Sequence, residues 1–345
     1  GIHWNFSPVL DLARDPRWPR FWETFGEDPY LVSQMGTAMV DGYQNSDVPF
    51  AATLKHFFGY GFTLSGKDRT PAWIPERQLR EYFLPPFQAA IEAGAMSIMV
   101  NSGEINGIPV HSDKELLTTL LRDELGFEGV LVTDWEDIKY LFTRHMIAHD
   151  YKEATKMAID AGIDMAMVPS DLDFTKHLFD LVTEGAITES RIDQSVRRIL
   201  MMKAKLGLFD TQGFPPSLDA YPATDKFEVY AAGAALESIT LLKNEAVNGR
   251  MVLPFSSDDK LFVSGPTAHS LNALNGGWTG TWQGKDTTYN TAGRPTMVEA
   301  METRLGSEQI VHMDLGMEFS DQEIQRVVRS IQRQKPSHVV LGLGE

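Results

Sequence analysis

The first 209 residues alternate short apolar runs with longer amphipathic stretches. The apolar runs predict strands over Trp4–Leu10, Phe50–Leu54, Ser97–Asn101, Gly129–Thr133 and Ile163–Val168. The stretches between them predict helices over Glu76–Ala93, Lys114–Leu125, Lys152–Ala161 and Ser190–Leu206. Continuous apolar strands that alternate with helices indicate a parallel sheet covered by helices.

Polar side chains gather where these predicted strands end, at Asp11, at Lys55 with His56, at Asn101 and at Asp134. Five strand–helix units fit either an open doubly wound sheet or most of a (β/α)8 barrel. A barrel carries its chemistry at the carboxyl rim of the strands, which favours the barrel. Because barrels typically need about 250 residues, we expect residues 1–209 to be a partial barrel that lacks its first strands.

Residues 210–225 are rich in proline and lack periodicity, which predicts a linker. A second α/β pattern follows over 226–345, with a helix near Lys226–Ser238, strands at Ile239–Lys243 and Lys260–Ser264, a helix near Asp321–Gln334 and a strand at His338–Leu341. The chain opens on a predicted strand and stops just after another. We therefore expect it to be truncated at both ends.

Charge and composition narrow the classes of function. The 31 basic and 47 acidic residues give a net charge of −16, which argues against nucleic acids and anionic membrane surfaces and favours a neutral ligand. The chain has no cysteine, so disulfides, thiolate nucleophiles and zinc–thiolate sites are excluded. No apolar run approaches the roughly 18 residues that would span a bilayer.

Asp134 is the strongest candidate for chemistry, in the segment GVLVTDWED. A buried strand delivers this carboxylate to its tip, where it could attack an electrophilic carbon. Asp is also a common helix cap, and spacing alone slightly favours the cap. Both interpretations stay open at this point.

Three other segments have a functional and a structural interpretation each. Lys55 and His56 could donate to hydroxyls, or Lys55 could extend to solvent while His56 bonds to backbone. The segment 15–28 (DPRWPRFWETFGED) could form a sugar platform, although most of its Arg and aromatic residues are expected to be structural. Trp278 and Trp282, in the Gly-rich GGWTGTWQG, could meet a ligand or pack at a domain interface.

The sequence gives little support for a cofactor or a metal. No G-x-G-x-x-G follows a strand, so we reject a dinucleotide site. His145 and His149 have i, i+4 spacing, but a solvated helix face explains them better than a metal. No strand–Ser–helix elbow is present either.

Together, six segments resemble glycoside hydrolase family 3, in its β-glucosidase and β-glucan glucohydrolase branch. The matching segments are NFSPVLDLARDPRWPRFWETFGEDP, AATLKHFFGYG, SIMVNSGEINGIPVHSD, GFEGVLVTDWEDI, AAGAALESITLLKNE and GGWTGTWQG. They occur in the family's order along nearly the whole chain. The resemblance implies a (β/α)8-like catalytic domain linked to an α/β sandwich, of which residues 226–345 are the first part.

The resemblance also implies roles for individual residues in a retaining hydrolysis by two carboxylates. Asp134 corresponds to the nucleophile, and Arg20, Lys55 and His56 to residues that hold sugar hydroxyls. Trp135 and one of Trp278 or Trp282 correspond to the clamp on the next sugar. The general acid/base glutamate is expected beyond Glu345, and neither a cofactor nor a metal is needed.

Besides the position of the general acid, two departures from the family pattern concern the site, and a further difference concerns the branch. Pro19 replaces a glycine before Arg20, which puts the direction of Arg20 in question. Ser102 stands where many relatives have a tyrosine that bonds the nucleophile. Phe58 and Tyr60 replace the proline and histidine of the family's N-acetylglucosaminidase branch, which disfavours that branch.

The leading hypothesis is therefore an exo-acting, retaining β-glucosidase or glucan glucohydrolase, whose partner is a β-linked glucoside or oligosaccharide. The alternatives are another β-glycosidase, and a carbohydrate-binding protein without catalysis. The resemblance implies a periplasmic or secreted location, and no membrane insertion is expected. The oligomeric state is not predicted.

Overall fold

The computed structural model describes residues 2–46, 50–210, 225–289 and 293–344. The chain divides into two compact units, Gly1–Ser217 and Leu218–Glu345. The division falls in the predicted linker, most of which (211–224) lies outside the described residues. Each unit is described by itself below.

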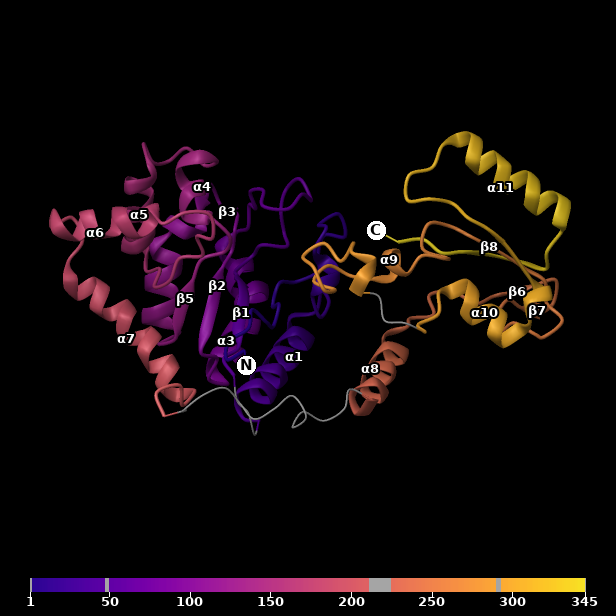
Figure 1. The fold of residues 1–345 in the computed structure, drawn as a ribbon, viewed down its shortest axis with the longest axis horizontal. Helices are drawn as coiled ribbons and strands as arrows, with labels where there is room; N and C mark the ends of the chain where they lie inside the picture. Colours follow the sequence, from indigo (N-terminus) through magenta and orange to yellow (C-terminus); the bar gives the residue numbers. More distant parts are fainter. Residues whose placement is uncertain (1, 47–49, 211–224, 290–292, 345) are drawn as a thin grey trace. The chain divides into compact units, whose positions relative to one another are not determined.

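The first unit contains a parallel sheet of order β1-β2-β5 (Figure 1). Its strands are β1 (Thr53–Phe57), β2 (Ser97–Val100) and β5 (Val130–Val132). Every residue of these strands is buried, as expected for a parallel sheet covered on both faces. Leu54 pairs with Ile98 and Ile98 with Leu131, so neighbouring strands in the sheet follow each other in chain order.

The two outer predicted strands are wrong in extent. Of the predicted strand Trp4–Leu10, only Trp4 and Val9 form isolated parallel bridges to the chain at β1, because Pro8 has no N–H to continue a ladder. Of Ile163–Val168, only Met165 bridges to Val132. Both segments nevertheless run along the sheet, since Leu10 N–H donates to Lys55 O and Thr133 N–H to Met165 O.

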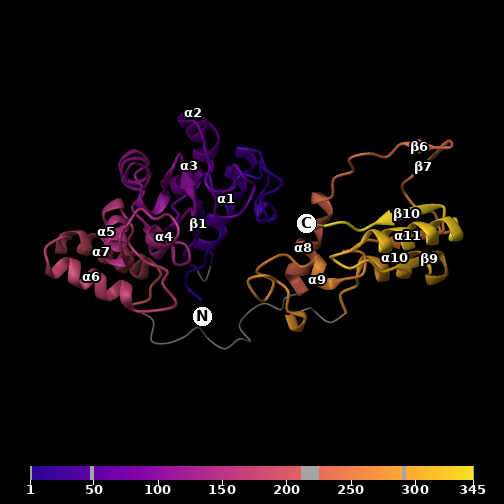
Figure 2. The same ribbon diagram turned by 90° about the horizontal axis from the view of Figure 1, so that it is seen from above.

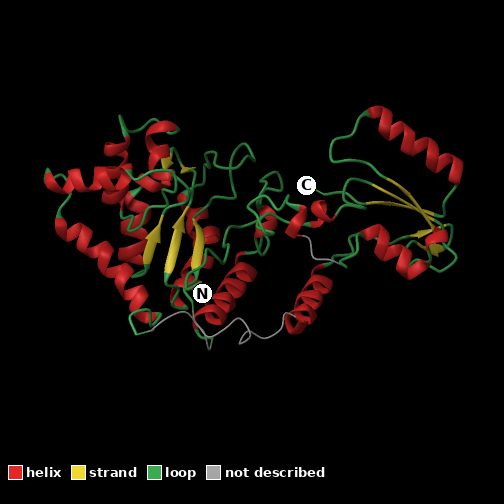
Figure 3. Ribbon diagram, in the orientation of Figure 1, coloured by secondary structure: helices red, strands yellow, loops and turns green. Residues whose placement is uncertain are grey.

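Four helical stretches of the first unit lie where the sequence predicts them. The first is continuous over α2 (Glu76–Gln78), the π-helical η2 (Leu79–Phe83) and α3 (Leu84–Glu92), and the second is the π-helical η4 (Glu115–Glu124). The third and fourth are α5 (Tyr151–Ala161) and α7 (Glu189–Lys205). Figures 2 and 3 show these helices around the strands.

Further elements were not predicted. They are η1 (Phe21–Glu23), α1 (Pro29–Gln44), the hairpin β3 (Glu104–Ile105) with β4 (Ile108–Pro109), η3 (Val110–Ser112), α4 (Asp137–Thr143) and α6 (Asp173–Thr183). Local signals for α1 exist, because Asp28 accepts from Tyr30 N–H and Pro29 occupies the first turn. Gly36 of α1 packs so closely on Leu10 that a Cβ there would lie 2.6 Å from Leu10 Cδ2.

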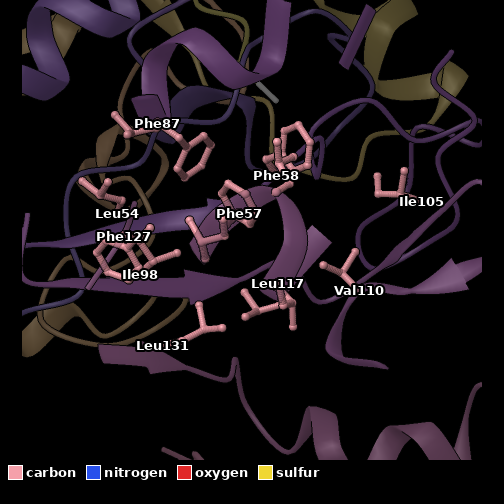
Figure 4. Packing of buried hydrophobic residues seen from close by; sticks show 14 of the residues in the cluster. Leu54, Phe57, Phe58, Phe87, Ile98, Ile105, Val110, Leu117, Phe127 and Leu131 are labelled. Atoms are coloured by element: carbon pink, nitrogen blue, oxygen red, sulfur yellow. The ribbon is translucent and has the colours of Figure 1, made fainter. Parts of the chain in front are cut away.

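The core of the first unit surrounds the carboxyl end of β1. Phe57 and Phe58 stack with ring centroids 4.7 Å apart, and Phe87 of α3 meets Phe57 edge to face at 5.2 Å (Figure 4). All three are buried. Since burying a Phe side chain stabilises a fold by about 1.5–3 kcal/mol, this cluster anchors the segment that carries Lys55 and His56.

The second unit has its own parallel sheet, of order β10-β8-β9. Its strands are β8 (Leu261–Ser264), β9 (Ile310–Met313) and β10 (His338–Leu341), and the helices α10 (Met297–Leu305) and α11 (Asp321–Gln334) each begin at a capping box. Figure 1 draws these two helices on opposite sides of the sheet. The remaining elements are α8 (Asp225–Ser238), β6 (Ala246–Val247), β7 (Arg250–Met251), α9 (Leu271–Leu274), η6 (Thr287–Tyr289) and η7 (Ser307–Gln309).

The predicted strand Ile239–Lys243 is wrong. This segment forms no strand within the described part of the chain, and Ile239, Leu241 and Leu242 are exposed. A strand needs a neighbour to satisfy its backbone, and no described strand pairs with this segment. β9 was missed, because its run Ile310–Met313 is short and interrupted by His312.

Candidate active site

The carboxyl ends of the parallel segments bring the chemistry-bearing residues of the first unit together. Asp11 follows the segment beside β1, Lys55 and His56 lie in the carboxyl half of β1, and Ser102 and Asp134 follow β2 and β5. Parallel strands place these ends on one edge of the sheet. The edge is therefore the candidate site.

Asp134 is buried, and its two carboxylate oxygens have different surroundings. Oδ1 accepts the N–H of Trp135 at 2.5 Å. Oδ2 has no hydrogen-bond partner among the described residues and lies 4.0 Å from His56 Nε2. One oxygen is thus held by backbone, and the other is buried without a hydrogen-bond partner among the described residues.

The structure contradicts the interpretation of Asp134 as a helix cap. Helix α4 begins at Asp137, and its N-cap residue is Glu136, whose φ of 59° is left-handed. The carboxylate of Asp134 accepts from the next residue instead of from an amide in the helix. The main-chain N–H of Asp134 donates to His111 Nε2 at 3.3 Å, which fixes this loop against η3.

His56 is held in one orientation by two partners. Its Nδ1 lies 2.7 Å from Asp11 Oδ2, and its Nε2 lies 3.1 Å from Arg20 Nη2. Arg is only a donor, so Nε2 accepts and Nδ1–H donates to Asp11. Burial, with the nearby charges of Arg20, Lys55 and Arg69, holds the pKa of His56 well below its usual value. The ring is therefore neutral.

Asp11 was not assigned a role from the sequence, although it was noted at a strand end. Burial raises the pKa of Asp11 to about 8, against the opposing effect of the Arg20 charge. Its Oδ2 also accepts the N–H of His56 at 3.2 Å. Asp11 thus ties both the ring and the backbone of His56 to the neighbouring segment.

Arg20 reaches the site despite Pro19. Its Nε donates to Glu23 Oε1 at 2.7 Å and its Nη2 to Glu23 Oε2 at 3.1 Å, a bidentate pair. Burial disfavours its charge, but Glu23 and the other neighbours raise the pKa of Arg20 overall. The concern about the direction of Arg20 is thereby answered, since the guanidinium lies against His56.

Lys55 is 7% exposed, so it does not extend to solvent as the structural interpretation supposed. Burial lowers the pKa of Lys55, while the carboxylates of Glu23, Asp134 and Asp11 partly offset this effect. The ammonium therefore belongs to the same group of charges as Arg20 and Asp134.

In the dense segment 15–28, Trp18 and Arg17 make structural contacts. Trp18 is fully buried and its Nε1 donates to Asp68 Oδ1 at 3.3 Å. Arg17 pairs with Asp15, 2.7 Å away, on the exposed side. Arg20 is the member that turns towards His56.

Two acidic or basic residues at the site were missed from the sequence, Arg69 and Asp137. Arg69 Nη2 lies 3.6 Å from Asp134 Oδ1, and Asp137 Oδ1 accepts from Ser102 Oγ at 2.8 Å. Burial, and then the charge of Asp134, raises the pKa of Asp137 to about 8. Asp137 lies three residues after Asp134, and this spacing could have identified it as a candidate site residue. Arg69 lies in a loop without periodicity, which gave no such signal.

The three tryptophans predicted to contact sugar are all exposed. Trp135 is 51% exposed and directly follows Asp134. Trp278 and Trp282 belong to the second unit, where Trp278 N–H donates to Trp282 O at 2.9 Å and closes a tight loop. The structure thus brings Arg20, Lys55, His56, Asp134 and Trp135 together in one unit, and the roles of Trp278 and Trp282 stay a prediction.

The histidines at 145 and 149 do not share a helix face, so that expectation is wrong. Both lie between α4 and α5, and His145 Nδ1 contacts Glu104 Oε1 at 2.6 Å. Among the residues that the structure describes, no group of three or more His, Asp or Glu could hold a metal ion. In the same residues, no helix has the length and apolar character needed to cross a bilayer.

Known proteins resemble the chain over most of its length. Residues 1–202 match the Glycosyl hydrolase family 3 N terminal domain. The lysosomal beta glucosidase of Dictyostelium discoideum is 49% identical over 297 residues, which cover 82% of this chain and 36% of that protein. A beta-xylosidase of Formosa agariphila is 39% identical over 292 residues, 80% of this chain and 40% of its own length.

The solved structure of beta-glucosidase from Listeria innocua in complex with glucose is similar with a TM-score of 0.80 and 33% identity, over 99% of this chain and 46% of that one. A mutant of the Listeria protein was solved in complex with laminaribiose. The chain belongs to glycosyl hydrolase family 3. It spans less than half the length of these relatives.

Proposed function

We propose that the protein releases terminal β-D-glucose from β-glucosides or β-glucan oligosaccharides with retention of configuration, and that Asp134 is its nucleophile. The observation that carries the proposal is the asymmetry of the Asp134 carboxylate, with Oδ1 held by the Trp135 amide and Oδ2 without a hydrogen-bond partner among the described residues. A nucleophile needs this combination of a fixed orientation and a free lone pair.

In the first step, Asp134 Oδ2 bonds to the anomeric carbon while the bond to the leaving oxygen breaks. The leaving oxygen takes a proton from a general acid, which we expect to be a glutamate beyond Glu345. In a retaining enzyme the two carboxyl groups are about 5–5.5 Å apart. Water then attacks the same carbon, and the carboxylate of Asp134 is regenerated.

The donors around Asp134 are proposed to hold the sugar. Arg20 and Lys55 are proposed to donate to sugar hydroxyls, and the neutral His56 presents Nε2, 4.0 Å from Asp134 Oδ2, as an acceptor. Trp135 and one of Trp278 or Trp282 are proposed to stack on the next sugar.

The substrate class is supported by the relatives. One is named a beta glucosidase, and the Listeria structures contain glucose and laminaribiose. The second candidate is a β-xylosidase, which the Formosa relative favours. The N-acetylglucosaminidase branch stays disfavoured, because Phe58 is buried and Tyr60 OH donates to Asp68 Oδ1 at 2.6 Å. We also propose a periplasmic or secreted location.

The test is covalent labelling of the full-length protein with 2-fluoro-β-glucosides and 2-fluoro-β-xylosides that carry a dinitrophenyl leaving group. This leaving group needs little acid assistance, so labelling reports on the nucleophile. Peptide mapping should find a fluoroglucosyl adduct on Asp134 and none in Asp134→Asn. A faster xyloside adduct would favour the second candidate. If the folded protein binds glucosides but forms no adduct and shows no turnover, the result would favour a carbohydrate-binding protein without catalysis.

A further inference from the structure

The Arg69 guanidinium lies between the two acidic side chains that flank the start of α4. Its Nη2 is 3.6 Å from Asp134 Oδ1, and its Nη1 is 3.8 Å from Asp137 Oδ2. Arg69 comes from the loop between β1 and α2, with a left-handed φ of 57°. Its side chain is 20% exposed, so most of it is shielded from water.

Other contacts keep this guanidinium in place. Nη1 donates to Ser102 Oγ at 2.6 Å, and the same hydroxyl donates to Asp137 Oδ1 at 2.8 Å. On the other side, Nε is 3.7 Å from Asp68 Oδ2, whose Oδ1 accepts from Tyr60 OH. Ser102, which stands where many relatives have a tyrosine, thus accepts a hydrogen bond from Arg69 and donates one to Asp137.

The arrangement balances charge that would otherwise be costly. Burial, and then the charge of Asp134, raises the pKa of Asp137, because two carboxylates this close repel each other when both are ionised. A guanidinium in contact with both offsets this repulsion. It lies on the side of Oδ1, which leaves Oδ2 free.

We propose that Arg69 is a positioning residue of the reaction, which holds Asp134 Oδ1 so that Oδ2 faces the anomeric carbon and which stabilises the carboxylate when it leaves the glycosyl ester. In that step the oxygen of water bonds to the anomeric carbon. The bond from this carbon to Asp134 Oδ2 breaks and its electron pair returns to the carboxylate. The proton of water passes to the general base. This inference rests on the function proposed above.

The experiment measures the step in which Asp134 leaves. Wild-type protein and Arg69→Gln are converted to the fluoroglucosyl-enzyme, freed of reagent, and followed as activity returns. The amide of Gln keeps a donor for Ser102 but loses the charge. We expect the rate of reactivation to fall by about tenfold or more. The loss should be smaller than the 10²–10³-fold typical of losing an oxyanion-hole donor, because the Trp135 amide still holds Oδ1.

Steady-state kinetics separate this role from a structural one. With a dinitrophenyl glucoside, a slow second step lowers kcat and KM together, because the glycosyl-enzyme accumulates. Arg69→Lys should recover part of kcat, since it restores the charge without the planar fork. Arg77→Gln is the matched control. Arg77 is exposed on the surface of the first unit, where its Nε lies 3.3 Å from Glu81 Oε2.

Unchanged reactivation and kcat in a folded Arg69→Gln would overturn the inference. If Arg69→Gln does not fold, the same measurements are made on Arg69→Lys. Reactivation, kcat and KM equal to those of the wild type in Arg69→Lys would show that a bidentate guanidinium is not needed. Failure of the wild-type protein to label at Asp134 would instead refute the proposed function. The two failures are therefore distinguishable.

Discussion

His56 Nδ1 lies 2.7 Å from Asp11 Oδ2, in a buried contact between residues 45 positions apart. The contact sets the orientation of the imidazole, because a neutral ring with Nδ1–H bonded presents Nε2 as an acceptor. Nε2 then receives Arg20 Nη2 at 3.1 Å and lies 4.0 Å from Asp134 Oδ2. Asp11 therefore acts on the site through His56.

Replacing Asp11 by Ala should loosen His56 and weaken substrate binding. Loss of a hydrogen bond to a charged or strongly polar group costs about 1.5–3 kcal/mol, so we expect kcat/KM for an aryl β-glucoside to fall about 10–100-fold. The fluoroglucosyl adduct should still form on Asp134, but more slowly. Wild-type kcat/KM in Asp11→Ala would show that the contact has no role in the site.

Asp134→Ala should abolish turnover and leave sugar binding largely intact. The variant removes the nucleophile, whereas Arg20, Lys55 and His56 remain in place to hold hydroxyls. The measurement is turnover of an aryl β-glucoside beside calorimetric titration with a β-glucoside. Activity that survives in Asp134→Ala contradicts the proposed role.

Trp135→Ala should raise KM for disaccharides more than for aryl glucosides. The side chain is 51% exposed next to the nucleophile, where it can offer a ring to a second sugar. The aryl glucoside serves as the internal control for damage to the first subsite. Equal changes in KM for both substrates would remove Trp135 from the second subsite.

The buried His111 should make the fold less stable in acid. Burial, with nearby His145 and Arg69, lowers the pKa of His111 from 6.5 to about 3. Between these two values the unfolded chain binds a proton that the native state does not. This contribution to stability is complete above pH 6.5 and is lost as the pH falls towards 3, with a slope of up to about 1.4 kcal/mol per pH unit.

Urea unfolding between pH 7 and pH 4 tests this prediction with His111→Gln. The Gln side chain can still accept from Asp134 N–H but does not titrate, so the variant should lose less of its free energy of unfolding than the wild type between pH 7 and pH 4. Other groups contribute to the slope as well: the low pKa of His56 acts in the same direction as His111, and the raised pKa values of Asp11 and Asp137 act in the opposite direction. The exposed His149 gives the control His149→Gln, which should keep the wild-type slope. Identical slopes in all three proteins would contradict the prediction.

Asp164 should matter for stability and little for the chemistry. It accepts from Arg122 Nη2 at 2.7 Å, Arg198 Nη1 at 2.8 Å and Ser195 Oγ at 2.7 Å, beside the start of β5. Asp164→Ala leaves the mostly buried Arg122 and the partly buried Arg198 without their carboxylate, which costs about 3–5 kcal/mol. Glu81→Ala, at an exposed pair, should cost less than about 1 kcal/mol. Thermal unfolding of both variants, with kcat per folded molecule, checks the prediction.

Several features of the fold are local, and the sequence predicts them well. The runs at Ser97–Asn101 and Gly129–Thr133 became β2 and β5, and the helix over Glu76–Ala93 is continuous. The strand ends also marked Asp11, His56 and Asp134 in advance. The family resemblance, which the comparisons confirm, rests on the same segments.

The errors come from features that depend on neighbours. Ile239–Lys243 has the residues of a strand, but a strand forms only where another strand pairs with it. The segment Trp4–Leu10 lies beside β1, yet Pro8 breaks the ladder that hydrophobicity alone predicts. The helix-cap interpretation of Asp134, left open by the sequence, is wrong because α4 begins at Asp137 and Glu136 occupies the N-cap position.

The sequence by itself determined the parallel α/β character, the edge of the sheet that carries polar residues, and the family. Apolar runs and the order of strands and helices depend on residues that are close together in the sequence. They can therefore be predicted from the sequence alone. Only the tertiary structure decided that Asp11 orients His56 and that Arg69 reaches Asp134. These contacts span 45 and 65 positions and depend on the path of loops without periodicity, because an ion pair is set by distance in space and leaves no pattern along the chain.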